Sequence, residues 1–534
     1  ALAGDAMTTA GGNVGVGYQA MSALTTGGGN TAVGHQSMAN GVVTGLYNTA
    51  LGDGSLLVLT SGAENAAVGR SALAANTTGG NNTAVGSGAL ASNTTGGGSV
   101  AVGKNSMNSN TTAIDNTAVG MNSLQANTTG TANVAFGRNA LQSNTTASNN
   151  TAVGYLSLTA NTTGQYNVAL GSGALDSNTT ANNNTAVGFG VMDANTTGSE
   201  NVAVGRYALT SNTTAANTVA IGNTALYLNT TGASNTGLGN GALYANTTGS
   251  ENVAVGSGAL DANTTANDNT AVGGAALGAN TTGVDNTAIG RVALLANTTG
   301  NNNVAVGRNA LLVNTTANDN TAVGMNALMA NTTGTNNTAV GKRAGTAITT
   351  GVRNNCFGLE AALNLTTGND NTFIGVGCSP NVTTGSGNIA IGDISAIGNR
   401  IFTLTTENDR IIMGHYNISN AYIKVAWTVT SDARDKNNFA DVPHGLSFVN
   451  QLVPYSYEFK LDREEAETDG IVRYGFKAQD ILALEGDNPV LVDNEDPDKL
   501  RYRETALIPV LTKAIQELSA QVEALTARIE TLEG

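Results

Sequence analysis

The polar stretch from Ser431 to Lys436 is the part of the sequence whose residue types and spacing come closest to a catalytic arrangement. It reads Ser-Asp-Ala-Arg-Asp-Lys. A serine hydroxyl becomes a nucleophile when a base takes its proton, and a lysine can be that base if desolvation lowers its pKa. Asp435, next to Lys436, could instead hold the lysine protonated. A polar turn that does no chemistry is therefore the alternative interpretation.

No second site of this kind is evident. Paired acids with flanking aromatic residues, as a glycosidase needs, do not recur in the chain. His35 is the only histidine in the repetitive region, and His415 has no metal-binding or catalytic partner nearby in sequence. Cys356 and Cys378 are better explained as two buried thiols than as a disulfide. We expect no metal and no cofactor.

Charge is distributed unevenly along the chain. Residues 431–534 carry 21 acids and 11 bases, which leaves 17 acids and 12 bases in residues 1–430. The net charge of −15 disfavours nucleic acid and anionic membranes as partners. No apolar run is long enough to insert into a bilayer. The chain opens at Ala1 without an initiator methionine, so we expect an N-terminal anchor or targeting segment to be missing.

A short phrase, close to Asn-Thr-Ala-Val-Gly, returns every 17 residues and organises most of the chain. Its glycine, which we call the marker glycine, recurs without a slip from Gly69 to Gly392. Earlier copies end at Gly17, Gly34 and Gly52, which makes 23 copies in all. A fixed short period of this length predicts a solenoid.

The phrase around Gly86 predicts how each coil packs. In an extended strand alternate residues face opposite ways, so Thr83 and Val85 share one face and Ala84 takes the other. We expect Val85 to enter the core. Ala84 is expected to meet a neighbouring subunit, because its position is nearly always alanine, with exceptions such as Gly15, Gly237, Cys356 and Phe373. Gly86 permits a turn, and the pair Ala89-Leu90 supplies the opposite wall. Each coil is therefore predicted to contain two short strands and two turns.

Polar residues recur in register as well. Asn stands four residues before the marker glycine in 21 of 23 copies, the exceptions being Ser99 and Thr218, which predicts a stacked asparagine ladder. Asn-Thr-Thr triplets recur from Asn76 to Asn331; turn chemistry explains them, and glycosylation is the alternative. Adjacent threonines point to opposite faces, which disfavours ice binding. Basic residues that directly follow a marker glycine are interpreted as solvated turn residues, with receptor contact as the alternative: Arg70, Lys104, Arg138, Arg206, Arg291 and Arg308.

The phrase Asn-x-Ala-Val-Gly-x-x-Ala-Leu, at Asn201–Leu209 and Asn303–Leu311, resembles the head repeats of YadA-type trimeric adhesins. The resemblance covers residues 13 to about 392. It implies a mainly β fold, a trimeric left-handed parallel β-roll that associates through its inner faces. Residues 1–392 are accordingly expected to form a β-roll shaft. Residues 393–430 are expected to form a β-rich neck in which Trp427 packs.

The C-terminal part resembles a second family. The ordered series begins at Ser431 and continues with Leu452–Tyr457, Tyr474–Asp480 and Pro489–Val492. It is similar to the intramolecular chaperone of phage tail spikes and fibres, known best from endosialidase tail spikes. Phe439 and Asp435 depart from the family's pattern. The resemblance implies a small α/β domain over 431–534 that trimerises the fibre, assists its folding and then cuts itself off. It implies Ser431 as nucleophile, Lys436 as general base and Asp432 beside the scissile bond.

The last helix, expected over about 503–534, carries a heptad pattern. β-Branched residues alternate with leucines at steps of three and four: Ile508, Leu511, Ile515, Leu518, Val522, Leu525, Ile529 and Leu532. This pattern predicts a coiled coil. The choice of residues at the core positions favours a coiled coil of two helices. The two family resemblances imply three chains, however, and a trimeric body imposes its stoichiometry on a short coiled coil attached to it.

These expectations combine into a homotrimeric fibre, most simply a phage tail fibre or appendage for host attachment in the virion tail. The alternative is a cell-surface adhesin or extracellular filament of the same repeat type. Adhesins of that type end in membrane-spanning strands, whereas this chain ends in the chaperone-like series and a coiled coil, which favours the phage. The expected partners are two further copies of the chain and a host surface receptor, either a glycan or an outer-surface protein.

Overall fold

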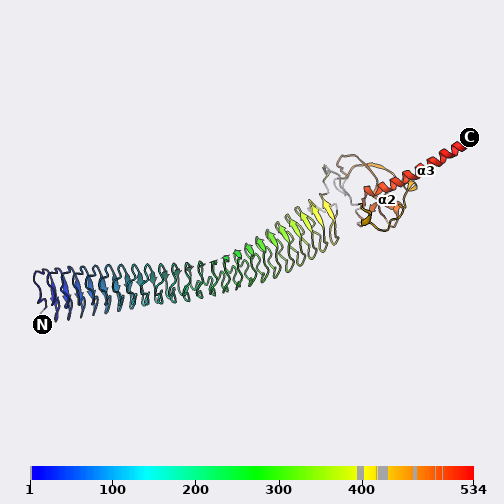
Figure 1. Cartoon of the computed structure of the whole chain (residues 1–534). Helices are drawn as coiled ribbons and strands as arrows, with labels where there is room; N and C mark the ends of the chain where they lie inside the picture. Colours follow the sequence, from blue (N-terminus) through cyan, green and yellow to red (C-terminus); the bar gives the residue numbers. More distant parts are fainter. Residues whose placement is uncertain are drawn as a thin grey trace. The chain divides into compact units, whose positions relative to one another are not determined.

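The computed structural model describes residues 3–393, 402–415, 418, 422, 431–460, 466–487, 489–495, 497–498 and 500–534. The chain divides into two compact units. The first comprises residues 1–392 and 404–411, and the second comprises residues 393–403 and 412–534. Both are drawn in Figure 1, the first running from blue to yellow and the second carrying α2 and α3.

The first unit is a parallel β-solenoid. It contributes a single sheet of 24 strands, each three residues long. The strands are β1 (Val14–Val16), β2 (Thr31–Val33), β3 (Thr49–Leu51), β4 (Ala66–Val68), β5 (Thr83–Val85), β6 (Val100–Val102), β7 (Thr117–Val119), β8 (Val134–Phe136), β9 (Thr151–Val153), β10 (Val168–Leu170), β11 (Thr185–Val187), β12 (Val202–Val204), β13 (Val219–Ile221), β14 (Thr236–Leu238), β15 (Val253–Val255), β16 (Thr270–Val272), β17 (Thr287–Ile289), β18 (Val304–Val306), β19 (Thr321–Val323), β20 (Thr338–Val340), β21 (Asn355–Phe357), β22 (Thr372–Ile374), β23 (Ile389–Ile391) and β24 (Ile411–Met413).

Equivalent residues of successive coils pair in register, so Ala84 lies opposite Ala101 and Val85 opposite Val102. The predicted solenoid with a 17-residue period is confirmed. Each coil, however, has one strand and not two, because the segment that includes Ala89 and Leu90 is a turn. Leu90 lies in the left-handed region with φ 51°, and most coils repeat this conformation. Such a backbone costs energy for a branched residue, and the burial of the leucine side chain offsets it.

The two faces of the strand are reversed relative to the prediction. Ala84 is completely buried inside its own coil, together with Ala89 and Leu90. Val85, expected in the core, points outward and is 37% exposed, and Thr83 is half-buried on the same face. The enclosed residue is small in coils whose opposite wall is a leucine; Phe373 occupies the same position, fully buried, in the coil where Ser379 replaces that leucine. The outward face of the strand is therefore the valine face.

The marker glycines form a column in which backbones approach closely. Gly86 has φ 136°, and a Cβ placed on it would lie 2.5 Å from the carbonyl oxygen of Gly103. No larger residue fits there, because real Cβ atoms do not approach a backbone oxygen so closely and the φ value itself favours glycine. The glycine thus does more than permit the expected turn, since it sets the distance between coils.

Asparagine ladders hold the coils together from inside, which confirms the predicted stacking. Asn82 is fully buried; its amide nitrogen Nδ2 donates to Asn65 Oδ1 at 3.1 Å and to the Gly96 carbonyl at 2.9 Å. The Asn-Thr-Thr asparagines form a second ladder, in which Asn93 Nδ2 donates to Asn76 Oδ1 at 2.8 Å and to Gly96 at 2.9 Å. Both hydrogens of Asn93 Nδ2 are used and the side chain is buried, so glycosylation is excluded there in the folded coil.

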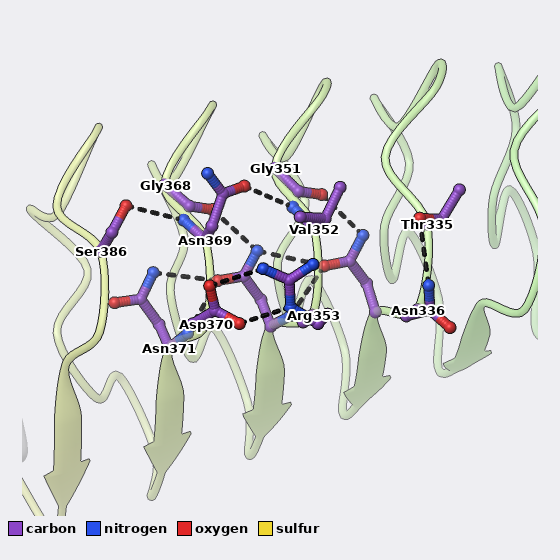
Figure 2. A network of polar contacts seen from close by, with 12 residues as sticks. Thr335, Asn336, Gly351, Val352, Arg353, Gly368, Asn369, Asp370, Asn371 and Ser386 are labelled. Carbon is purple, nitrogen blue, oxygen red and sulfur yellow. Dashed lines mark hydrogen bonds and ion pairs between the residues drawn. The ribbon is translucent and has the colours of Figure 1, made fainter.

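Figure 2 shows the first of these ladders near the C-terminal end of the solenoid. Asn371 Nδ2 donates to Asn354 Oδ1 at 2.9 Å and to the Gly385 carbonyl at 2.9 Å. On the surface beside this ladder, Arg353 pairs with Asp370 of the next coil through two contacts of 2.5 and 2.8 Å. Buried amide pairs of this kind stabilise the stack because their donors and acceptors have partners; among the described residues the exception is Asn331 Oδ1, at the end of the second ladder.

The strict period ends at Gly392, but one further coil follows. Arg410 N donates to Asn388 Oδ1 at 3.0 Å, and Ile389 N donates to the Arg410 carbonyl at 2.8 Å. The step is then 22 residues instead of 17. The predicted neck strand that contains Trp427 lies outside the described residues. Cys356 and Cys378 are both buried thiols that form no disulfide, as expected, and burial raises the pKa of the Cys356 thiol to about 12.

The second unit is a small α/β fold, as predicted. Its elements are η1 (Ala433–Asp435), α1 (Leu446–Val449), β25 (Tyr455–Tyr457), β26 (Arg473–Gly475), α2 (Ala478–Glu485), β27 (Val492–Asp493), β28 (Arg501–Tyr502), η2 (Glu504–Ala506) and α3 (Leu507–Glu533). β25 pairs antiparallel with β26, and β27 with β28. Its core is formed by Phe448, Ile481, Leu491, Val492, Leu507 and Val510. No helix in the described part of the chain combines the length and hydrophobicity that crossing a bilayer requires.

Candidate functional site

The Ser431–Lys436 cluster is built on the short turn η1. Lys436 Nζ donates to Ser431 Oγ at 2.6 Å, although the two residues are five apart in sequence. The turn that brings them together begins at Asp432, whose Oδ1 accepts from the Arg434 backbone N–H at 2.9 Å. The backbone N–H of Lys436 donates to the Ala433 carbonyl and closes the turn. The fold thus joins a hydroxyl to an amine in hydrogen-bond geometry, which is the first requirement for proton transfer between them.

Asp432, which the family resemblance places beside the scissile bond, pairs with Arg434 in this chain. Its carboxylate forms an ion pair with Arg434, with Nη2–Oδ2 at 2.6 Å. Hydrogen bonds from Arg434 lower the pKa of the Asp432 carboxyl below its usual value. Asp432 therefore acts within this chain as the N-terminal cap of η1 and as the counter-ion of Arg434. Sequence reasoning did not assign a role to Arg434; the Asp-x-Arg spacing across a turn is the signal that could have found it.

Ser431, Asp432 and Lys436 are all exposed in the single chain. Serine–lysine chemistry needs surroundings that exclude water, because a solvated ammonium does not take up a further proton. The single chain supplies the pair but not such surroundings. The side chain of Asp435, the proposed competitor for Lys436, lies outside the described residues.

Three charged side chains, Glu485, Glu517 and Lys513, make hydrogen bonds to backbone groups within the C-terminal domain. Glu485 accepts from the backbone N–H groups of Val490, Leu491 and Val492 at 2.9, 2.7 and 3.0 Å. Glu517 of α3 accepts from Leu446 N at 2.7 Å, at the start of α1. Lys513 Nζ donates to the Val442 carbonyl at 2.5 Å. The Glu517 and Lys513 contacts tie α3 to the segment that follows the Ser431 turn, and the Glu485 contacts tie α2 to the segment before β28.

α3 carries two different apolar faces. Leu507, Val510 and Ala514 are buried against the domain's own core. The eight residues of the predicted heptad seam are 38% to 79% exposed, and they have no partner within the described part of the chain: Ile508, Leu511, Ile515, Leu518, Val522, Leu525, Ile529 and Leu532. A helix with a solvent-facing apolar seam of this length is stable in water only when the seam is covered.

The solenoid presents a comparable surface along its sheet. The residue before each marker glycine points outward, as does the residue two positions earlier. Examples are Phe136, 55% exposed, and Ile289, 40% exposed. Valine, threonine and isoleucine dominate this face from β1 to β23.

The remaining residues singled out from the sequence have ordinary environments. His35 pairs with Asp53 at 2.9 Å and stacks on Tyr18. The six basic residues after marker glycines are exposed, as predicted for turn residues. Two of them cover tyrosine rings, Arg138 over Tyr155 and Arg206 over Tyr207. No cluster of three or more His, Cys, Asp or Glu side chains in the described ranges is arranged to hold a metal ion.

Comparison with known families supports the interpretation of the C-terminal unit. Residues 431–490 match the family model described as the chaperone of endosialidase. The match begins at Ser431 and ends before β27 and α3. A search of curated proteins finds no match to the chain. A parallel solenoid of 17-residue coils followed by this domain is the organisation of a tail fibre or tail spike with a C-terminal chaperone domain.

Proposed function

We propose that this chain, a β-solenoid joined to a chaperone-of-endosialidase domain, forms a homotrimeric phage tail fibre or appendage that attaches the virion to its host. In this proposal the C-terminal domain brings three chains together, assists the folding of the shaft and then cleaves itself at Ser431. The observation that carries the proposal is the exposed heptad seam of α3.

The seam supports self-association because its residues repeat at the spacing that coiled coils use. Burying them on a second copy would remove eight large apolar side chains from water, each worth roughly 1.5–3 kcal/mol when fully buried. A neighbouring face of α3 is already packed on its own domain through Leu507 and Val510, so the seam remains for a partner. Association of identical chains around an axis parallel to α3 buries the seam of every copy to the same extent.

The outward face of the solenoid gives a second contact surface for the same assembly. Its valines and threonines continue along the whole stack, and Ala84 and its equivalents are buried in their own coils. The subunit contact of the proposed trimer therefore uses the valine face, not the alanine face. In a stack of near-identical coils, each coil fits several neighbours about equally well. A domain that associates the chains at one end sets the register in which the coils of one subunit pair with those of the next.

Assembly also supplies what the Ser431–Lys436 pair lacks. The pair is in contact at 2.6 Å but exposed. Packing of three chains around it would exclude water and make the lysine a better base. Self-cleavage is therefore proposed to follow trimer formation. The bond next to Ser431 is cut, and the C-terminal domain is released once the shaft is in register.

Immunogold electron microscopy tests the attachment function. Antibodies raised against the recombinant solenoid are applied to a culture in which the chain is expressed from its natural locus. Gold on the tails of phage particles is the expected result. Gold confined to the surface of cells, with unlabelled particles, would contradict the phage assignment and favour the cell-surface adhesin.

A further inference from the structure

Four aromatic side chains lie in consecutive coils on one surface of the solenoid. Phe189 and Tyr207 meet edge to face with ring centroids 5.4 Å apart, and Tyr207 meets Tyr227 in the same way at 6.3 Å. Tyr227 and Tyr244 stack at 5.4 Å with their planes 5° apart. We call this set the aromatic ladder. The only other ring contact between coils in the described part of the solenoid is the single Tyr18–His35 pair.

The coil does not need aromatic residues at these positions. Phe189 and Tyr207 stand one and two residues after their marker glycines, and Tyr227 and Tyr244 stand five residues after theirs. The fifth position is alanine in other coils, for example Ala91. All four belong to the turn that follows the strand, outside the buried Ala and Leu positions. Packing of the coil therefore does not explain the ladder.

The ladder is accessible and amphipathic. Phe189 is 51% and Tyr244 is 37% exposed, while Tyr207 and Tyr227 are half-buried because they lie between other rings. The hydroxyls of the three tyrosines make no hydrogen bond to any described residue. Arg206 covers one side of Tyr207, with its guanidinium carbon 4.6 Å from the ring centroid. Aromatic rings with unengaged hydroxyls are typical of surfaces that bind a ligand with apolar and polar parts.

Carboxylates lie at both ends of the aromatic ladder, at the same position of the repeat as Tyr227 and Tyr244, five residues after the marker glycine. Asp176 and Asp193 occupy the fifth position of preceding coils, and Asp261 occupies it in the next coil. Asp193 Oδ1 lies 3.8 Å from where a Cβ of Gly173 would be, and Asp261 Oδ1 lies 3.7 Å from the same point at Gly241. Partial burial raises the pKa of each of the three carboxyls. Asp193 and Asp261 thus each lie beside a glycine, whereas Asp176 accepts a hydrogen bond from the Thr159 side chain.

We propose that the aromatic ladder binds a linear, uncharged polysaccharide lengthwise, with sugar rings packed on Phe189, Tyr207, Tyr227 and Tyr244 and sugar hydroxyls donating to the flanking aspartates. The inference rests on the proposed attachment function and names the chemistry of the receptor. The ladder is one side chain wide and repeats along the axis, so it matches a ligand that is itself narrow and periodic. The apolar face of a pyranose ring packs on an aromatic ring, and its hydroxyls suit carboxylate acceptors.

Two other occupants fit less well. A polyanion, such as a nucleic acid or an acidic glycan, is repelled by acids at both ends of the ladder. A second copy of the chain is already assigned to the valine face of the sheet, whereas the ladder lies on the turn beyond the marker glycines. Contact of subunits through the ladder is therefore treated as an outcome of the test.

Calorimetric titration of the full-length fibre with cellohexaose and with chitohexaose tests the inference. The fibre is expected to bind at least one of these neutral oligosaccharides. The double variant Y227A/Y244A is expected to lose about tenfold or more in affinity, because two aromatic contacts are removed. Y227F/Y244F keeps the rings and is expected to retain most of the affinity.

A matched control comes from the same position of the repeat, five residues after the marker glycine. L295A/L312A removes two apolar side chains at the fifth position of other coils and is expected to leave binding unchanged. Absence of wild-type binding to both probes, equal affinity of Y227A/Y244A, or an equal loss in L295A/L312A would overturn the inference. So would a change of sedimentation coefficient in Y227A/Y244A, because it would make the ladder a contact between subunits.

Adsorption of the labelled fibre to a panel of bacterial strains separates this inference from the proposed function. If the fibre adsorbs and Y227A/Y244A adsorbs and titrates equally well, the ladder is not the receptor site although attachment stands. If the wild-type fibre binds an oligosaccharide in the ladder but adsorbs to no strain, the ladder stands as a saccharide site and host attachment fails.

Discussion

Replacing Gly273 by alanine should open the solenoid locally, because the glycine column sets the spacing of the coils. Gly273 has φ 133°, and a Cβ on it would lie 2.6 Å from the Gly290 carbonyl oxygen and 2.7 Å from the carbonyl carbon. The obstruction is backbone, not a flexible side chain. It can be relieved only if one coil moves away from the next.

The cost follows from two contributions. A non-glycine residue in this region of φ costs about 1–3 kcal/mol. Moving the coils apart also weakens backbone hydrogen bonds such as Gly290 N to the Val272 carbonyl at 2.7 Å, each worth roughly 0.5–1.5 kcal/mol. We expect Gly273→Ala to destabilise this coil interface by about 3 kcal/mol or more. In a solenoid the damage stays near the altered interface because each coil contacts only its neighbours.

Gly274 provides a matched control one residue away. A Cβ there would meet nothing within 4 Å, and its φ lies outside the left-handed region. Gly274→Ala should be neutral or stabilising by about 0.4–1 kcal/mol, because alanine restricts the unfolded chain. Hydrogen exchange of the full-length fibre, read by mass spectrometry over β16 and β17, measures both variants. Protection in these strands should fall roughly a hundredfold in Gly273→Ala and stay unchanged in Gly274→Ala. Equal protection in the two variants would refute the steric account of the glycine column.

Further predictions concern the asparagine ladder, the heptad seam of α3 and the Ser431–Lys436 pair. Asn303→Asp removes the donor to the Ala317 carbonyl and buries a charge, so thermal unfolding should show a loss of about 3 kcal/mol or more, and unchanged unfolding would argue against the ladder. Ile515→Asp places a charge on the seam and should dissociate the assembly in sedimentation experiments, whereas Gln516→Asp, beside it but off the seam, should not; identical behaviour would exclude the seam as the contact. Ser431→Ala and Lys436→Met should each abolish the C-terminal fragment that mass spectrometry detects from the wild-type chain, and a fragment that persists in both would rule out this pair.

The sequence predicted the coils well because a 17-residue period leaves few alternatives. The asparagine ladders were also predictable, since a buried stack of amides is the simplest use of an asparagine that recurs at the same position of nearly every coil. The C-terminal unit was recognisable from its ordered motifs, and the seam of α3 from its heptads. The contact between Ser431 and Lys436 could be anticipated from the same motifs but not its exposure, which depends on the surroundings.

The inside and outside of the strand could not be decided by alternation alone. Alternation separates Thr83 and Val85 from Ala84 but does not say which face is enclosed. The informative signal was variability, since the outward positions change freely between Thr83 and Val100, or Val85 and Phe136, whereas the enclosed position is alanine in most coils, Phe373 being the large exception. The left-handed conformation of Leu90 had no signal in sequence, because leucine rarely adopts it. The aromatic ladder was hidden too, since its members stand at three different positions of the repeat.

The mass of the fibre in solution tests the central claim most directly. The Ser431→Ala variant keeps every chain intact, so its mass by sedimentation equilibrium reports stoichiometry alone. At micromolar concentration the account predicts a single species of three times the 53.5 kDa subunit. A monodisperse species of 53.5 kDa, with the seam of α3 left open to solvent, would contradict it.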